Sequence, residues 1–166
     1  IDLTPPQLVK QAEQGVFDLA LHITEEAPLE LHQRVLFTEH YVLAGRIGHP
    51  KLKRKPSREE FCALEHMMVS REGGGFFGVT DKALADVGLQ RKVVLSVPHF
   101  LMVMSVLAST DLVAMLPSRL VRGNPALQVV DAPLEVPGYE MAMFWGERLH
   151  RDPAHNWFRE HLAATV

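Results

Sequence analysis

Residues 92–117 read KVVLSVPHFLMVMSVLASTDLVAMLP. The β-branched residues 92–97 are typical of a strand, and Pro98 follows at a position where a helix can begin. Apolar side chains over residues 100–107 give this helix a buried face, and residues 111–116 form a second apolar strand. A strand, a helix and a strand in succession indicate a right-handed crossover, which joins parallel strands and places helices on a sheet. This stretch therefore predicts an α/β fold with mostly parallel sheets.

The flanking segments continue the alternation of strands and helices. The expected strands are short apolar runs at residues 17–23 (FDLALHI), 35–44 (VLFTEHYVLA), 66–69, 127–130 and 139–145. The expected helices carry cap signals and cover residues 4–15, a segment opened by the capping box Ser57 to Glu60, residues 76–87 and residues 153–164. Three successive glycines make residues 71–75 a loop.

The overall composition restricts the classes of protein to which the chain can belong. Its 166 residues carry 17 lysines and arginines against 20 aspartates and glutamates, and this length fits one domain or two small lobes. No basic face for nucleic acid is expected, and the basic run at residues 51–55 is interpreted as a solvated loop. The single cysteine, Cys62, indicates a reducing compartment and hence a cytoplasmic location. The longest apolar runs, such as residues 101–107, are too short to span a membrane.

Several stretches, taken together and in order, resemble the effector-binding domain of LysR-type transcriptional regulators, a bacterial family. They are LVKQAEQGVFDLALHI at residues 8–23, LFTEHYVLAGRIGHP at 36–50, GLQRKVVLSVPHF at 88–100 and STDLVAMLPSRL at 109–120. The resemblance continues through Trp145 to Leu162 and so covers essentially the whole chain. VPHF followed by STDLVAMLP is similar to the branch that contains regulators of aromatic-compound metabolism and nodulation.

This resemblance implies the fold of type 2 periplasmic binding proteins, in which two α/β lobes are joined by two crossing strands and a small molecule binds between them. Lobe I would comprise residues 1–42 plus 131–166, and lobe II residues 43–130. The polar residues 38–40 and Asp131 would lie on the strands that cross the cleft.

The resemblance also implies what this chain lacks and what it associates with. Family members begin this domain one strand and one helix earlier, after a winged helix-turn-helix domain that binds DNA. These parts are absent from a chain that opens at Ile1, so DNA binding is expected only through the missing domain. A lobe that lacks a strand exposes an unpaired edge or an apolar face, and together with the pairing of the family's effector domains this predicts a homo-oligomer, a dimer or a tetramer.

Two helix starts are candidates for holding an anionic effector, because the free N–H groups and the dipole at a helix N-terminus favour negative charge. One is Thr4–Pro5 and the other is Pro98–His99–Phe100. Without the resemblance, Thr4 would be only an N-cap and His99 only a surface histidine. With the resemblance, His99 is predicted to contact the effector, because an imidazole can donate a hydrogen bond to a carboxylate and Phe100 can pack against an aromatic ring.

The loop that follows the strand at residues 66–69 is a third candidate. Ser70, Arg71, Glu72 and Gly73 come at the carboxyl end of that strand, where open α/β sheets bind their ligands. Arg71 could hold a carboxylate with two hydrogen bonds or be a solvated loop residue, and the two interpretations weigh equally. By the same argument His22 and Ile23, at the end of the strand at residues 17–23, face the cleft.

Other functions are less well supported by the residues. The histidines at positions 150, 155 and 161 do not have the spacing that brings metal ligands to one helical face, and no G-x-S-x-G motif or cofactor signature occurs. We therefore expect neither an enzyme nor a metal or cofactor site. The resemblance, with these candidate residues, implies a sensor of a small, aromatic acid that controls transcription through a shift between lobe arrangements. The alternative is a solute-binding protein of a transporter with the same fold.

Overall fold

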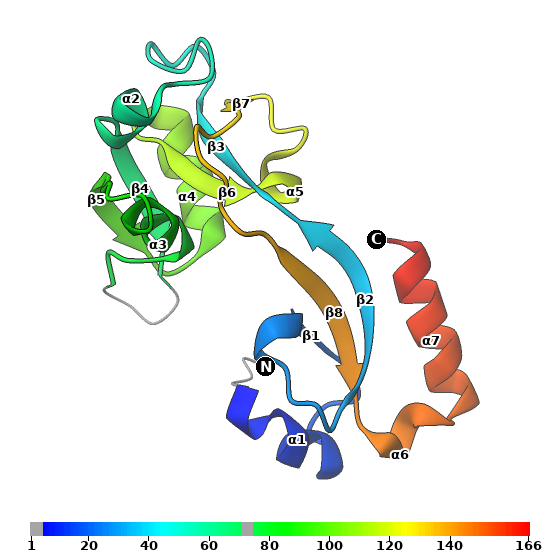
Figure 1. Ribbon diagram of the computed structural model, residues 1–166. Helices are drawn as coiled ribbons and strands as arrows, with labels where there is room; N and C mark the ends of the chain where they lie inside the picture. The colour runs from blue at the N-terminus through cyan, green and yellow to red at the C-terminus, as the bar shows by residue number, and fades with distance from the viewer. Residues whose placement is uncertain (1–4, 71–74) are drawn as a thin grey trace. The chain divides into compact units, whose positions relative to one another are not determined.

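The computed structural model describes residues 5–70 and 75–166 of the chain (Figure 1). The chain divides into two compact units, which are Ile1–Glu39 with Gly138–Val166 (unit 1) and His40–Pro137 (unit 2). The units divide between residues 39 and 40 and between residues 137 and 138, whereas the sequence-based lobe boundaries fall between residues 42 and 43 and between residues 130 and 131. In the part of the chain that the structure describes, no helix has the length and the apolar composition needed to cross a membrane.

Unit 1 is built on a three-stranded antiparallel sheet with the strand order β1-β8-β2. Its strands are β1 (Ala20–Ile23), β2 (His32–Glu39) and β8 (Tyr139–Trp145), and its helical segments are α1 (Pro5–Glu13), the 3-10 turn η1 (Thr24–Glu26), α6 (Glu147–His150) and α7 (Pro153–Ala164). Leu8 and Ala12 of α1 pack with Ala142 and Phe144 of β8 in one buried cluster. The apolar face of α1 therefore covers this sheet.

The ends of α1 and α7 follow from the signals in the sequence. The chain leaves α1 through Gly15, whose φ of +68° suits a residue without a side chain. At α7, Asp152 is the N-cap, and its Oδ1 accepts a hydrogen bond of 2.6 Å from the amide of His155. Pro153 occupies the first position of α7, where its missing N–H is not needed. Both helices confirm the sequence-based prediction.

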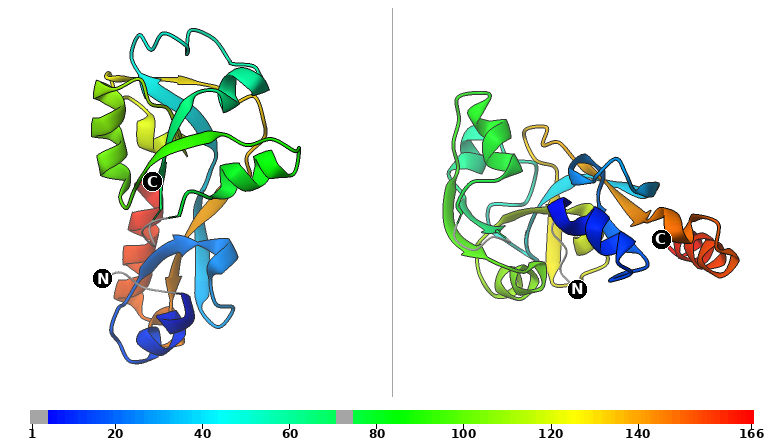
Figure 2. Two further views of the ribbon diagram at one scale, coloured as in Figure 1. Left: turned by 90° about the vertical axis from the view of Figure 1, so that its left-hand side faces the viewer. Right: turned by 90° about the horizontal axis from the view of Figure 1, so that it is seen from below.

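Unit 2 contains two small sheets. In one, β3 (Tyr41–Arg46) lies between β6 (Ala114–Pro117) and β7 (Leu127–Val130); in the other, β4 (Glu65–Val69) pairs with β5 (Lys92–Val97). An isolated bridge from His66 to Val113 continues from β4 toward β6. The helices are α2 (Arg58–Cys62), α3 (Val79–Ala85), α4 (Phe100–Ser109) and α5 (Ser118–Val121). Of these, α4 contacts β3, β4, β5 and β7 (Figure 2).

The core of unit 2 has two parts, one on each side of β3. Val42 and Ala44 pack in one buried cluster with Leu107 of α4, whereas Leu43 packs in another with Phe61 of α2. This alternation follows from the strand itself, because successive side chains point to opposite faces. A strand that is buried on both faces reads as a continuous apolar run, which explains the sequence of β3.

The predicted direction of the strands is wrong. Of the five strand pairs in the described residues, β4–β5 is parallel and the other four are antiparallel. The β5–α4–β6 segment is, as predicted, a crossover between parallel strands, but β4 lies between them: β4 pairs parallel with β5, and its His66 forms a parallel bridge with Val113, the residue before β6. The α/β class holds, and the four antiparallel pairs are formed by strands that the chain brings together over long sequence separations or by a direct return.

The strands β1 and β6 each begin three residues later than predicted, and three other predictions also differ from the observed elements. The single strand expected at residues 35–44 is two strands, β2 and β3, which separate at His40 and join different sheets. Asp131 lies on no strand, because β7 ends at Val130 and β8 begins at Tyr139. The helix expected from residue 76 begins at Val79 instead, since its N-cap is Gly78.

Candidate functional site

The carboxyl ends of β4 and β5 form one edge of unit 2. Val69 and Val97 are register partners in this parallel pair, and the amide of Ser70 donates a hydrogen bond of 2.9 Å to the carbonyl oxygen of Val97. Ser70 therefore lies next to the turn that leads into α4. The structure places Ser70 with His99 and Phe100 at this edge, as the order of strands and helices in the sequence predicts.

His99 is the N-cap residue of α4 and has an extended backbone with φ −132° and ψ 138°. Its imidazole is exposed and does not cap the amides of the first turn. Phe100, the first residue of the helix, is 37% exposed. An exposed imidazole, the start of a ten-residue helix and an aromatic ring are therefore neighbours, and the first two favour an anion.

Two further aromatic residues adjoin this edge and were not identified from the sequence. A Cβ on Gly75 would lie 3.5 Å from Oγ of Ser70, so the chain returns beside Ser70 at this point. Phe76 and Phe77 follow directly and are 56% and 69% exposed. Two successive phenylalanines directly after a glycine loop could have predicted this surface from the sequence. Residues beside a loop are commonly exposed, and exposed aromatic rings are typical of binding surfaces.

The other predicted site residues are divided between unit 1 and the part of the chain outside the described residues. Pro5 is the first residue of α1, and His22 and Ile23 end β1, all in unit 1. His22 is partly buried, and its Nδ1 lies 3.1 Å from the carbonyl oxygen of Ile23. Four predicted residues lie outside the described residues: Thr4, Arg71, Glu72 and Gly73.

A buried ion pair fixes the chain downstream of the exposed phenylalanines. Arg91 Nε and Nη2 donate to Oδ1 and Oδ2 of Asp81, each at 2.8 Å, and the two side chains are 3% and 11% exposed. Asp81 Oδ2 also accepts a hydrogen bond of 2.9 Å from the amide of Gly78. Asp81 thereby defines where α3 begins and holds the end of the segment that carries Phe76 and Phe77.

His66 lies in the core of unit 2, and burial lowers the pKa of its imidazole to about 4. Its Nε2 is 2.7 Å from the carbonyl oxygen of Phe61, and the two rings are 4.6 Å apart between centroids. A carbonyl oxygen can only accept, so Nε2 carries a proton, and the low pKa keeps the ring neutral at neutral pH. Among the described residues, Nδ1 of His66 has no hydrogen-bond partner.

We expect the free energy of unfolding to fall as the pH drops from about 6.5 to about 4. An imidazole in the unfolded chain binds a proton below about pH 6.5, whereas folded His66 stays neutral until about pH 4. The unfolded state binds more protons in this window, so stability is full above it and declines by about 3 kcal/mol across it.

Urea unfolding at several pH values checks this for the wild type and for His66→Gln, whose amide nitrogen can still donate to the Phe61 carbonyl. The variant should lose this part of the pH dependence, while His99→Gln, at an exposed position, should keep it. Parallel stability curves for the wild type and His66→Gln would show that His66 does not control the acid response.

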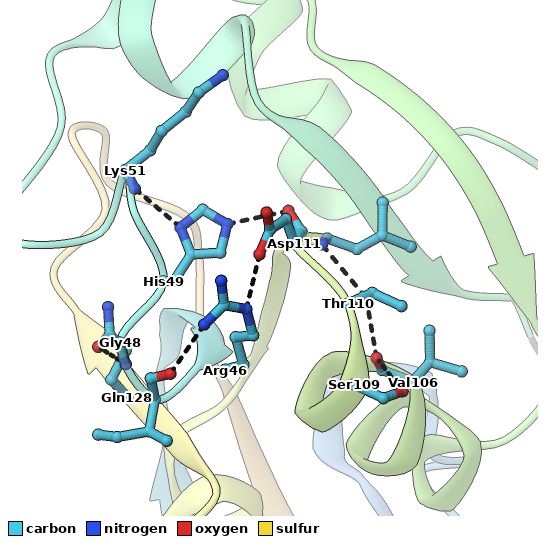
Figure 3. Close-up of polar contacts among 11 residues, drawn as sticks. Arg46, Gly48, His49, Lys51, Val106, Ser109, Thr110, Asp111 and Gln128 are labelled. Atoms are coloured by element: carbon cyan, nitrogen blue, oxygen red, sulfur yellow. Dashed lines mark hydrogen bonds and ion pairs between the residues drawn. The ribbon is translucent and has the colours of Figure 1, made fainter.

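A second buried histidine, His49, has a structural role (Figure 3). Its Nδ1 accepts a hydrogen bond of 3.2 Å from the Lys51 amide, and its Nε2 lies 2.9 Å from the carbonyl oxygen of Asp111. Arg46 Nε donates at 2.6 Å to Oδ1 of the same Asp111. Both ring nitrogens are engaged, so His49 ties the loop after β3 to the segment before β6.

Comparison with known proteins identifies the family to which this chain belongs. The LysR substrate binding domain matches residues 2–166, and the chain belongs to this family. Solved regulatory domains of the family share the α/β fold related to periplasmic binding proteins, which confirms the predicted fold class.

Several relatives are transcriptional regulators by name. The chain is 36% identical over 161 residues to HTH-type transcriptional regulator SyrM 1 of Sinorhizobium fredii, covering 95% of this chain and 48% of that protein. It is 35% identical over 156 residues to HTH-type transcriptional activator NagR of a Ralstonia species, covering 92% and 52%. A crystal structure of a probable transcriptional regulator, PA0477 of Pseudomonas aeruginosa, matches with a TM-score of 0.79 and 28% identity, covering 94% and 53%.

The lengths and the names of these relatives indicate the class of function. The chain spans about half the length of the curated relatives that it matches. The relatives are named as regulators and not as enzymes or transport proteins, which favours the regulator over the solute-binding alternative.

Proposed function

We propose that this domain binds a small acid, with an aromatic acid as the preferred class, at the carboxyl ends of β4 and β5. The observation that carries the proposal is the hydrogen bond from the Ser70 amide to the Val97 carbonyl, which brings Ser70 beside His99 and the start of α4. His99 donates a hydrogen bond to the carboxylate, and the first-turn amides of α4 add a favourable dipole.

The preference for an aromatic acid is supported by the rings at the same edge. Phe100 is partly exposed at the helix start, and Phe76 and Phe77 are exposed in the segment that returns past Ser70. Aromatic rings prefer offset or edge-on contacts with other rings, and such pairs contribute about 0.5–1.5 kcal/mol beyond the area that they bury. The acid group would thus be held by His99 and the ring by phenylalanine side chains.

Further contacts come, in this proposal, from the predicted residues outside this edge. The guanidinium of Arg71 would add a second donor to the carboxylate, and Glu72 and Gly73 belong to the same segment that the sequence predicts to bind the effector. Thr4, Pro5, His22 and Ile23 are further candidates for contacting an effector, as the resemblance to the family implies.

The whole protein, in this proposal, is a cytoplasmic transcriptional regulator that acts as a homo-oligomer. It reads DNA through a helix-turn-helix domain outside this chain, as the names of its relatives suggest. The acid changes the output only if it binds one arrangement of the two units more tightly than the other. An acid that binds both arrangements equally tightly leaves their populations unchanged.

Isothermal titration calorimetry tests the ligand class on the 166-residue chain. Benzoate, salicylate and phenylacetate are compared with their amides, which keep the ring and the shape but carry no charge. We expect at least one acid to bind and its amide to bind at least tenfold more weakly, because the charge-assisted hydrogen bond is lost. Equal binding of acids and amides, or binding of amides alone, would contradict the proposal.

A further inference from the structure

Residues 75–78, which lead into α3, run back along the carboxyl end of β4. A Cβ on Gly75 would lie 3.5 Å from Oγ of Ser70, and a Cβ on Gly78 would lie 3.3 Å from Cε of Met68. Met68 is a buried residue of β4, and Ser70 follows the last residue of this strand. The two phenylalanines between these glycines therefore lie beside the end of β4, at the candidate effector site.

Buried groups fix this segment at its downstream end. The Gly78 amide donates a hydrogen bond of 2.9 Å to Oδ2 of Asp81, and the Arg91 guanidinium holds both oxygens of that carboxylate at 2.8 Å. Thr80 and Leu84 of α3 are buried, so the helix that begins here is seated in the core of unit 2. The backbone that joins Gly78 to the phenylalanines is thus held by a buried carboxylate.

Phe76 and Phe77 are exposed although the backbone next to them is held in place. Their exposed fractions are 56% and 69%. A single exposed apolar residue is ordinary, but two neighbouring rings beside a fixed backbone form an apolar surface of the kind that binds ligands. A side chain that is held in place before binding also loses less conformational freedom when a ligand arrives. The two rings are therefore suited to packing against an apolar ligand.

We propose that Phe76 and Phe77 determine the selectivity of the effector site for aromatic over aliphatic acids, and that Asp81 is the residue that positions them. This inference rests on the proposed function and deepens it. His99 recognises the acid group, which aromatic and aliphatic acids share, whereas the two rings recognise the part in which these acids differ. Asp81 does not contact the acid and acts through the Gly78 amide.

The selectivity has a physical cause that can be measured separately from the rest of the binding. Benzoate and cyclohexanecarboxylate carry the same charge on a six-membered ring, so the hydrogen bond from His99 contributes equally to both. Only the aromatic ring has the charge distribution that favours offset or edge-on contacts with phenylalanine. Each such contact strengthens binding by roughly two- to tenfold beyond the effect of buried area.

Isothermal titration calorimetry with these two acids gives the ratio of their affinities. We expect the wild type to favour benzoate by roughly two- to tenfold for each ring that contacts it. Phe76→Leu with Phe77→Leu should bring the ratio close to one, because leucine is apolar but has no aromatic ring. The affinity for cyclohexanecarboxylate should change little in this variant, since its apolar contacts are kept.

Two variants test the positioning role of Asp81. Asp81→Leu with Arg91→Met leaves an apolar pair in the core but removes the acceptor of the Gly78 amide, so it should fold and lose the selectivity. Asp81→Glu should keep the selectivity, because a glutamate at the third helical position can accept a hydrogen bond from the N-cap amide. A purely structural role would lower the affinities for both acids together and leave their ratio unchanged.

Trp157→Leu is the matched control, since it removes a ring that is 67% exposed on α7 of unit 1 and should leave the ratio as in the wild type. The proposal is overturned if the wild-type ratio is close to one, or if the two phenylalanine replacements leave it unchanged. An unchanged ratio in Asp81→Leu with Arg91→Met would overturn the positioning role. If neither acid binds the wild type, the proposed function fails and this inference fails with it; if both acids bind but the ratio does not respond, only this inference fails.

Discussion

Replacing Asp81 with alanine is expected to lower the free energy of unfolding by about 3–5 kcal/mol, because it leaves the Arg91 guanidinium buried without its counter-ion. The Arg91 side chain is 3% exposed and loses both of its bonds to Asp81. Its remaining nitrogen, Nη1, already has no hydrogen-bond partner among the described residues. The Gly78 amide loses its acceptor as well, so the start of α3 loosens with the core.

Urea unfolding followed by circular dichroism at neutral pH measures this loss. Glu65→Ala is the matched control, because it removes an ion pair to Lys92 in which both side chains are more than half exposed, and it should change stability little. A double replacement, Asp81→Leu with Arg91→Met, should recover much of the loss, since an apolar pair leaves no buried charge. Similar midpoints for Asp81→Ala and Glu65→Ala would mean that the Arg91 pair does not stabilise unit 2.

Replacing His99 with alanine is expected to weaken binding of the acid effector roughly ten- to a hundredfold, which corresponds to the loss of one charge-assisted hydrogen bond of about 1.5–3 kcal/mol. Folding should not change, because the imidazole is exposed and caps no helix amide. His99→Gln should recover part of the affinity, since its amide nitrogen can donate in place of the imidazole.

Calorimetry with the acid that binds the wild type most tightly gives the three affinities. The control is His161→Ala, which removes an exposed histidine from α7 and should bind like the wild type. If His99→Ala and His161→Ala bind the acid equally well, His99 is not part of the effector site.

The sequence predicts the elements whose ends depend on local signals. Lys92–Val97, Leu127–Val130 and Tyr139–Trp145 are strands over the predicted residues, because each is an apolar, strand-forming run between breaks. Pro153–Ala164 is a helix over the predicted residues, because Asp152 and Pro153 determine its start.

The elements that were predicted wrongly depend on distant contacts. Strand direction is decided by pairing, and β3 pairs with β6 and β7, which follow more than sixty residues later. No glycine or proline marks the break between β2 and β3 at His40. The break arises because β2 and β3 join different sheets, which the local sequence does not reveal. A single strand was therefore the reasonable local interpretation.

The residues of the candidate site and of the buried ion pair also divide into those that local signals predict and those that depend on distant contacts. His99 and Phe100 follow from the position of Pro98, and Ser70 from the end of a strand, so local signals place them. The ion pair between Asp81 and Arg91 could not be predicted from the sequence. Two charged residues ten positions apart are usually exposed, and only the structure shows that these two are buried and paired.

The central claim, that a small acid binds at the carboxyl ends of β4 and β5, is tested most directly by mapping amide chemical shifts in the chain by nuclear magnetic resonance. The chain is titrated with the tightest-binding aromatic acid, and its uncharged amide serves as the comparison. We expect the acid to move the amide signals of Ser70, His99 and Phe100 most within unit 2, and the uncharged amide to move them far less. Shifts of equal size for both compounds, or shifts that leave these three residues unchanged while others move, would contradict it.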